Sequence, residues 1–324
     1  MKKVKWGIIG CGDVTEVKSG PAFNKIENSE LIAVMRRNGE LAEDYAKRHN
    51  VPKWYDDADK LINDPDVNAI YIATLPDAHA YYTIKTAEAG KPVYVEKPMA
   101  RNYNECLQMI EACKKNNASL FVAYYRRRLP LFLKVKELVE NNTIGKILFV
   151  NIRLHVPQKA SDYESTKPWR VIPEISGGGH FVDLASHQLD YLDYLLGPIV
   201  ATKSITKNIS KLYDAEDFVS ASLEFENGVL GTGVWSFTTD ENKRVDEIEI
   251  TGAKGKIIFS TFDQAPIRLV TKDYEKVFTE NFPQNIQQPL IETVVSELLG
   301  IGKCPSTGET ASRTSKIIDF ILMK

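Results

Sequence analysis

The N-terminal stretch constrains the fold more than any other part of this 324-residue chain. Val4–Ile9 is a short apolar run with β-branched residues, and Gly10-Cys11-Gly12 follows it directly. An apolar strand that enters a glycine turn and then a helix is typical of a βα unit whose turn binds a pyrophosphate. Thr15 stands where the third glycine of G-x-G-x-x-G is expected, so the motif is incomplete. An ordinary tight turn remains the alternative.

Strand and helix patterns then alternate along the first third of the chain. Further strands are predicted over 31–35, 69–73, 92–95 and 120–123, and helices over 41–49, 57–63, 77–89 and 103–116. This alternation predicts a parallel, doubly wound sheet, which binds ligands at the carboxyl ends of its strands. Gly10, Arg36, Thr74 and Lys97 each follow a strand end. We therefore expect these four residues to face one crevice.

The residues after the second strand point to the kind of dinucleotide. An NAD site usually has an acidic residue here, which holds the ribose 2′-hydroxyl. This chain has Arg36-Arg37-Asn38 instead. Two guanidinium groups suit the 2′-phosphate of NADP. The alternative is a pair of solvated surface arginines.

The pattern changes in the second half of the chain. A helix is predicted over 130–141, and strands are predicted over 147–156, 199–206, 218–225, 229–237, 247–251, 256–260 and 267–271. Strands joined by short turns predict a large, mostly antiparallel open sheet. A helix over 181–196 covers one face, and only tail helices over 286–299 and 309–322 remain for the other. An uncovered sheet face predicts a homodimer or homotetramer.

These patterns divide the chain into two predicted domains. Residues 1–123 form an N-terminal Rossmann domain, and residues 124–324 form a C-terminal α/β domain that binds substrate and dimerises. The fold class is therefore α/β.

A glycine run leads into the helix of the second domain. Gly177-Gly178-Gly179 cannot lie within a stable helix, and we interpret it as a flexible loop that delivers the helix to a site. Asp183, His187 and Asp190 then fall on one helical face. A carboxylate one turn from an imidazole suits proton transfer, since histidine titrates near neutral pH. The alternative is an acidic residue that the helix dipole favours.

Two further places carry side chains suited to a polar site. Lys97 follows a strand and precedes Pro98, which favours an extended conformation, and it can act as an acid or stabilise charge beside a carbonyl. A solvated lysine is the alternative. Trp169-Arg170 suits a sugar or a nicotinamide amide, whereas a loop tryptophan that fills a gap is the alternative.

Composition narrows the class of protein. Hydrophobic residues make up 43% and charged residues 26%, and the net charge is −2, which is ordinary for a globular protein. No basic block extends beyond Arg126–Arg128, so no nucleic-acid partner is expected. No apolar run approaches the roughly 18 residues of a membrane span, and the N-terminus lacks the features of a signal peptide. The cysteines at 11, 106, 113 and 304 have neither metal-site nor disulfide spacing, so we expect no metal and a cytoplasmic protein.

Three motifs together resemble one family. GIIGCGDV at the start, EKP at Glu96–Pro98 and GGGHFVDLASH at Gly177–His187 stand in the order of the Gfo/Idh/MocA (glucose–fructose oxidoreductase / inositol dehydrogenase) family. The resemblance runs the whole chain. It implies a Rossmann domain followed by an α/β domain with a large antiparallel sheet. It also implies NAD(P)-dependent hydride transfer to or from a sugar, cyclitol or related polyol or ketose.

The resemblance further implies roles for individual residues. Lys97, Asp183 and His187 form the catalytic group: His187 exchanges the proton on the reacting oxygen, Lys97 stabilises or shares it, and Asp183 orients the substrate or the histidine. In relatives that resemble anhydrofructose reductase, a serine–arginine pair holds the NADP phosphate, and here Arg36 replaces the serine while Arg37 matches the arginine. NADP is thus the preferred cofactor, with NAD as the alternative. The candidate cofactor contacts are Gly10, Gly12, Asp13, Val14, Arg36, Arg37, Thr74, Leu75, Pro76, His79, Glu96, Lys97, Trp169 and Arg170.

Two other activities occur among similar proteins. One is a sugar-pathway regulator that binds a dinucleotide without turnover, and the other is a lyase or hydrolase that uses bound NAD as a transient oxidant. Regulators of this kind tend to lose the lysine or the histidine, whereas Lys97 and His187 are both present here. The departures at Thr15 and Tyr125–Arg128 leave the substrate open.

Overall fold

The computed structural model describes residues 1–323, which form two compact units. Unit 1 consists of Met1–Leu129 and Pro283–Ser312, and unit 2 consists of Pro130–Phe282 and the chain from Arg313 onward. The division predicted from the sequence has a single boundary and does not include this return of the chain to unit 1. Gln287 illustrates the return, because its backbone N–H donates to the Lys18 carbonyl at 3.1 Å.

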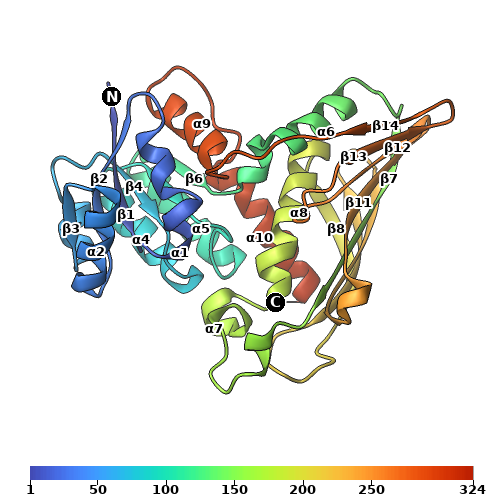
Figure 1. Ribbon diagram of the computed structural model, residues 1–324, viewed down its shortest axis with the longest axis horizontal. Coiled ribbons are helices and arrows are strands. Elements are labelled where there is room, and N and C mark those ends of the chain that lie inside the picture. The colour runs from blue at the N-terminus through green and yellow to red at the C-terminus, as the bar shows by residue number, and fades with distance from the viewer. Residues whose placement is uncertain (324) are drawn as a thin grey trace. The chain divides into compact units, whose positions relative to one another are not determined.

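Unit 1 contains a six-stranded sheet in the order β3-β2-β1-β4-β5-β6 (Figure 1). Every pair of neighbouring strands is parallel, which confirms the predicted doubly wound sheet. The short strand β3 was not predicted. The strands are β1 Val4–Ile9, β2 Ser29–Met35, β3 Lys53–Tyr55, β4 Ala69–Ile72, β5 Val93–Val95 and β6 Leu120–Val122.

Side-chain caps begin several helices of unit 1. Asn38, Asp57 and Asn102 accept hydrogen bonds from the backbone N–H groups of Leu41, Asp59 and Glu105, and each cap supplies a partner that the first turn of its helix lacks. The helices are α1 Asp13–Val17, α2 Gly39–His49, α3 Ala58–Ile62, α4 Pro76–Glu88, α5 Tyr103–Lys115 and α9 Gln288–Leu298, with the 3₁₀ helices η1 Gly20–Asn24 and η2 Tyr125–Arg128.

Unit 2 contains an eight-stranded sheet in the order β14-β13-β12-β11-β7-β10-β9-β8. Its pairs are antiparallel except for β7 with β10, so the predicted mostly antiparallel sheet is confirmed. The last strand, β14, was not predicted. The strands are β7 Ile147–Pro157, β8 Ile199–Lys207, β9 Phe218–Phe225, β10 Leu230–Thr239, β11 Val245–Gly252, β12 Gly255–Phe259, β13 Ile267–Thr271 and β14 Glu275–Phe278.

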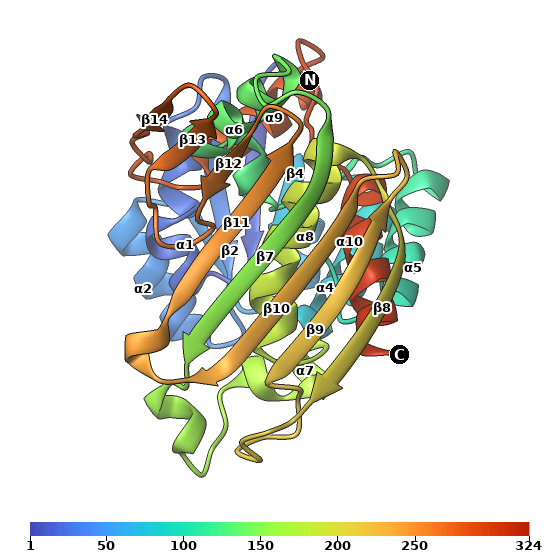
Figure 2. The same ribbon diagram turned by 90° about the vertical axis from the view of Figure 1, so that its right-hand side faces the viewer.

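Helix α8 packs on one face of this sheet, behind it in Figure 2. A buried hydrogen bond marks the contact, because the indole N–H of Trp235 on β10 donates to Gln188 Oε1 on α8 at 2.7 Å. The helices of unit 2 are α6 Pro130–Glu140, α7 Pro173–Ser176 and α8 His180–Leu196, with the 3₁₀ helices η3 Ala160–Tyr163, η4 Trp169–Val171 and η5 Glu241–Lys243; α10 Gly308–Leu322 ends there.

The opposite face of the sheet is open in the described part of the chain (Figure 2). Large apolar side chains remain exposed on it, with Ile205 at 64%, Leu230 at 57% and Val277 at 56% of their full area. Within residues 1–323, no helix has the length and apolar character that a membrane span requires.

Candidate functional site

The turn between β1 and α1 has the geometry of a phosphate cradle. Gly10 has φ +91°, and a Cβ there would lie 2.9 Å from Thr74, so only glycine fits. The N–H groups of Gly10 and Cys11 donate to the Met35 carbonyl at 2.9 and 3.2 Å, which fixes the turn to β2. At Gly12, by contrast, a Cβ would meet nothing closer than Gly10 O at 3.9 Å. The turn is therefore rigid and open on the side where its backbone can approach a ligand.

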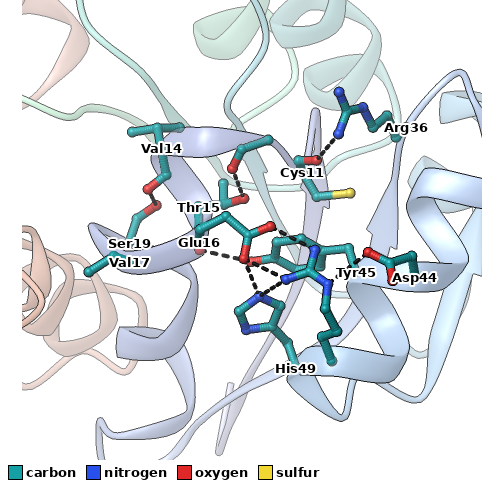
Figure 3. Close-up of polar contacts among 12 residues, drawn as sticks. Cys11, Val14, Thr15, Glu16, Val17, Ser19, Arg36, Asp44, Tyr45 and His49 are labelled. Carbon is teal, nitrogen blue, oxygen red and sulfur yellow. Dashed lines mark hydrogen bonds and ion pairs between the residues drawn. The ribbon is translucent and has the colours of Figure 1, made fainter.

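Thr15, the departure from the glycine motif, is accommodated within the turn. Its hydroxyl donates to the Gly12 carbonyl at 2.7 Å, and its own carbonyl accepts from Tyr45 Oη at 2.8 Å (Figure 3). A Cβ on Gly20 would stand 2.2 Å from that same carbonyl. Gly20 therefore lets the chain after α1 pass close to the Thr15 carbonyl and the Tyr45 hydroxyl.

An ion-pair cluster ties the short helix α1 to α2 (Figure 3). The two terminal nitrogens of Arg48 each donate to the Glu16 carboxylate at 2.8 Å, and His49 Nε2 lies 2.7 Å from the same carboxylate. Arg48 Nε also donates to Asp44 at 2.7 Å. Hydrogen bonds from Arg48 lower the pKa of Glu16 to about 2. Since α1 has only five residues, this cluster and Tyr45 hold it in place.

A cavity of about 460 Å³ opens at the carboxyl ends of β1, β2 and β4. Gly10, Arg36 and Thr74 line it together, as predicted, whereas Lys97 is not among its lining residues. The Arg36 guanidinium lies 3.5 Å from the Cys11 carbonyl. The lining consists of Gly10, Cys11, Gly12, Met35, Arg36, Arg37, Asn38, Leu41, Ala73, Thr74, Leu75, Asp77, Ala78 and Tyr82.

The charged residues of this cavity come mainly from the end of β2. Arg36 and Arg37 are exposed cations directly after β2, where Asn38 follows in place of an acidic residue, while the cavity lining also includes Asp77 from the first turn of α4. Burial raises the pKa of the Cys11 thiol to about 11, so the turn carries no thiolate that would repel phosphate. Asp13 and Val14 begin α1, and Pro76 begins α4, so these predicted contacts lie beside the cavity rather than in its lining.

Glu96 and Lys97 directly follow β5 in unit 1. One carboxylate oxygen of Glu96 accepts from Tyr71 Oη at 2.5 Å and from Gln287 Nε2 at 2.6 Å, and the other accepts from the Lys97 N–H at 3.1 Å. Glu96 is 7% exposed. These contacts indicate that Glu96 fixes the backbone that carries Lys97. The Lys97–Pro98 peptide is cis.

His79 connects two loops of unit 1. Its Nε2 lies 3.1 Å from the Thr74 carbonyl, and its Nδ1 lies 3.0 Å from the Pro98 carbonyl. The ring is 1% exposed, and this burial lowers its pKa. His79 therefore supports the Thr74 loop from inside, and its predicted contact with the cofactor stays a prediction.

The glycine run before α8 differs from the flexible loop expected from the sequence. All three glycines are buried. Gly177 has φ +81° and ends α7, while a Cβ on Gly178 would lie 2.3 Å from Val182 and one on Gly179 would lie 2.7 Å from Ala215. The run is packed rather than flexible, because its missing side chains let α8 approach neighbouring backbone.

Asp183 and the Trp169-Arg170 pair come together in unit 2. Arg170 Nε lies 3.3 Å from Asp183 Oδ2, and the Arg170 guanidinium lies 4.4 Å from the Trp169 ring centroid. The candidate cofactor pair and one candidate catalytic residue thus share a single cluster. His187 lies one turn further along α8 and is 3% exposed.

A second acid–imidazole pair on α8 was missed by sequence reasoning. His180 Nε2 lies 3.1 Å from Asp162 Oδ2, and both side chains are buried. Burial lowers the pKa of His180, and the Asp162 charge opposes that shift. The sequence pattern does not predict this pair, because Asp162 lies in the short 3₁₀ helix η3, 18 residues before His180. Together with Arg170–Asp183 it attaches the segment between β7 and α8 to the first turn of α8. Among the described residues, no cluster of His, Cys, Asp and Glu could hold a metal ion.

Comparison with known proteins identifies related sequences over the whole chain. Residues 4–124 match the oxidoreductase family with an NAD-binding Rossmann fold, and residues 132–258 match the GFO/IDH/MocA C-terminal domain. Oxidoreductase P35 of Formosa agariphila is 41% identical over 318 residues, which is 98% of each chain. Myo-inositol 2-dehydrogenase of Thermotoga maritima is 28% identical and covers 83% of this chain and 79% of its own length.

Solved structures share the fold. A levoglucosan dehydrogenase in complex with NADH and levoglucosan superimposes with a TM-score of 0.89 at 23% identity, over 99% of this chain and 96% of the other. This likeness extends across the Rossmann sheet and the large second sheet.

Proposed function

Because the chain belongs to the Gfo/Idh/MocA oxidoreductase family, we propose that it transfers hydride between a nicotinamide dinucleotide and a sugar, cyclitol or related polyol or ketose. The observation that carries the proposal is the open cradle at Gly12, which forms part of a cavity with two arginines. Relatives named for myo-inositol and levoglucosan support the substrate class. We propose that the predicted domain of residues 1–123 binds the cofactor and that the predicted domain of residues 124–324 binds the substrate.

We propose NADP as the preferred cofactor. Arg36 and Arg37 would hold the 2′-phosphate, and the N–H groups of Gly12 and of Asp13 and Val14 at the start of α1 would hold the pyrophosphate. Thr74 and Leu75 line the same cavity, and Asp13, Val14, Pro76, His79 and Glu96 border or support it. The bound dinucleotide supplies the hydride chemistry at its nicotinamide ring.

The chain supplies proton transfer and orientation. We propose that His187 exchanges the proton on the reacting oxygen, that Lys97 stabilises or shares it, and that Asp183 orients the substrate or the imidazole. Arg170 contacts Asp183 at 3.3 Å, and a carboxylate held in this way suits an orienting role. Trp169 and Arg170 would also contact the cofactor.

Nicotinamide absorbance under steady-state turnover tests this function. Purified protein is screened with NADP(H) and NAD(H) against inositols, aldoses, ketoses and anhydro-sugars. A reductase or dehydrogenase changes the cofactor in proportion to product. Product without net cofactor change would indicate the lyase or hydrolase, and binding without turnover on any of these sugars would indicate the regulator.

We also propose that the open face of the unit 2 sheet forms a homodimer or homotetramer interface. Exposed apolar residues lie on β8, β10 and β14, including Ile205 and Leu230. Light scattering should give at least twice the 36.5 kDa monomer mass, and Ile205→Glu with Leu230→Lys should reduce it. A monomeric wild type would contradict the interface.

We also propose a cytoplasmic location. The four cysteines are free and buried, which agrees with a reducing compartment.

A further inference from the structure

The loop after β12, residues 260–266, is built around one carboxylate. The backbone N–H groups of Thr261, Phe262 and Asp263 donate to Asp246 on β11 at 3.0, 2.5 and 2.9 Å. Ser260 Oγ also accepts from the Ala265 N–H at 2.8 Å. Three consecutive N–H groups on one carboxylate leave this part of the loop little freedom.

A second anchor ties the same loop to α8. Gln188 Nε2 donates to Thr261 Oγ1 at 3.1 Å, while Gln188 Oε1 accepts from the Trp235 indole at 2.7 Å. Gln188 and Trp235 are both fully buried. Because both ends of the Gln188 amide are held, its orientation is fixed, and it adjoins His187 in the sequence.

These two anchors place Phe262 against His187. The ring centroids are 6.0 Å apart with an interplanar angle of 73°, an edge-to-face contact. The second side-chain torsion of histidine is broad and intrinsically weakly restrained. A ring held beside the imidazole therefore restricts its orientation and shields it from water.

We propose that Phe262 is a positioning residue for the His187 imidazole, and that Asp246 and Gln188 hold Phe262 in place. The catalytic importance of this arrangement rests on the proposed function, in which His187 exchanges the proton. The placement of the ring itself does not, since it follows from contacts within unit 2.

Histidine NMR tests the proposal without any substrate. The full-length protein is labelled at histidine Cε1, and the His187 signal among the 5 histidines is assigned with His187→Asn. Asp183 and Asp190 share the helix with His187, and Asp246 and Asp263 lie on the loop side. A substitution at Phe262 changes none of these charges, so a change in the His187 titration reports on packing.

Phe262→Ala should raise the His187 titration midpoint by about half a pH unit or more, because water then reaches the imidazolium. Phe262→Leu, which keeps most of the apolar volume, should give a smaller rise, and Phe262→Tyr should stay close to wild type. The matched control is Tyr274→Ala, which removes a half-exposed ring from the same unit and should leave His187 unchanged.

An unchanged His187 signal and midpoint in Phe262→Ala would overturn the proposal. If Phe262→Ala does not fold, the test uses Phe262→Leu. A His187 titration midpoint in Phe262→Leu equal to that in Phe262→Tyr would then overturn the proposal. The proposed function fails separately, if the wild type turns over no cofactor on any screened sugar, and the proton-transfer role of His187 fails if His187→Asn keeps wild-type turnover.

Discussion

Two glycine turns, one in each unit, precede a helix, and they differ in what surrounds them. At Gly12 a Cβ would have only the Gly10 carbonyl near it, at 3.9 Å. At Gly178 and Gly179 a Cβ would stand 2.3 Å from Val182 and 2.7 Å from Ala215. Space beside the first turn is open, whereas the space beside the second turn is occupied by neighbouring residues of the chain. Glycine therefore stands beside open space in one unit and within tight packing in the other.

The charges around the two turns differ in the same way. Arg36 and Arg37 beside the first turn are exposed at the edge of a cavity. Beside the second turn, Asp162 and His180 are paired and buried. The exposed arginines of the first region can bind an anion from solution, whereas the polar groups of the second region already contact each other. We therefore propose that the first region binds the dinucleotide, whereas the second region supports the helix that carries Asp183 and His187.

The largest expected effect concerns the proposed proton-transfer residues, of which His187 lies on the helix that follows the second turn. Lys97→Ala and His187→Ala should each lower kcat by about a hundredfold or more, since general acid–base help contributes on that scale. NADP(H) affinity should hardly change in His187→Ala and fall moderately in Lys97→Ala. Asp183→Asn should be milder if the carboxylate only orients the substrate. Steady-state kinetics on the best substrate check this, and near-wild-type kcat would leave α8 as scaffold only.

Alanine at the two turns should separate binding from stability. Gly178→Ala should lower the free energy of unfolding by about 1–3 kcal/mol, because its Cβ collides with Val182. Gly12→Ala should change it by less than about 1 kcal/mol, yet weaken NADPH binding about tenfold or more, because the backbone must approach the pyrophosphate. Urea unfolding and fluorescence titration of both variants measure the contrast. The comparison fails if Gly12→Ala loses as much free energy of unfolding as Gly178→Ala, or if it binds NADPH with the wild-type dissociation constant.

A smaller effect is expected from the cluster that holds α1. The pKa of Glu16 is lowered to about 2 by Arg48, so its stabilising contribution is full above its ordinary value of 4.5 and disappears as pH falls toward 2. Glu16→Gln should therefore be less stable than wild type at pH 7, and the gap should narrow below about pH 4.5. The urea midpoints of unfolding of both proteins, measured from pH 7 down to about pH 3.5, test this prediction. Lys3→Gln, which removes an exposed ion pair with Glu30, is the control.

Most helices and strands followed from the sequence because their patterns are local. The pattern of a single stretch predicted a helix over 103–116, and the structure has α5 there. Strand β3 was missed because Lys53–Tyr55 is short and partly exposed. The packing of α9 with unit 1 was missed because it depends on Gln287 meeting Glu96, which lies far away in the sequence. Contacts of this kind leave no periodic trace.

The candidate site was predictable to a similar extent. Strand ends placed Gly10, Arg36 and Thr74 together because parallel strands share one carboxyl edge. Sequence reasoning took the Gly177–Gly179 run for a flexible loop, since crowding by Ala215 cannot be read from the glycines themselves. Phe262 was not singled out, because only the hydrogen bonds to Asp246 bring it to His187.

The central claim is that the cavity beside the first turn is an NADP site, and cofactor affinity tests it most directly. Dissociation constants for NADPH and NADH are measured by fluorescence titration in wild type and in the Arg36→Asp, Arg37→Ala double variant. Wild type should bind NADPH about tenfold or more tightly than NADH, and the double variant should lose that preference, because the charged hydrogen bonds to the 2′-phosphate are gone. Equal or tighter NADH binding in wild type, unchanged in the double variant, would contradict the account.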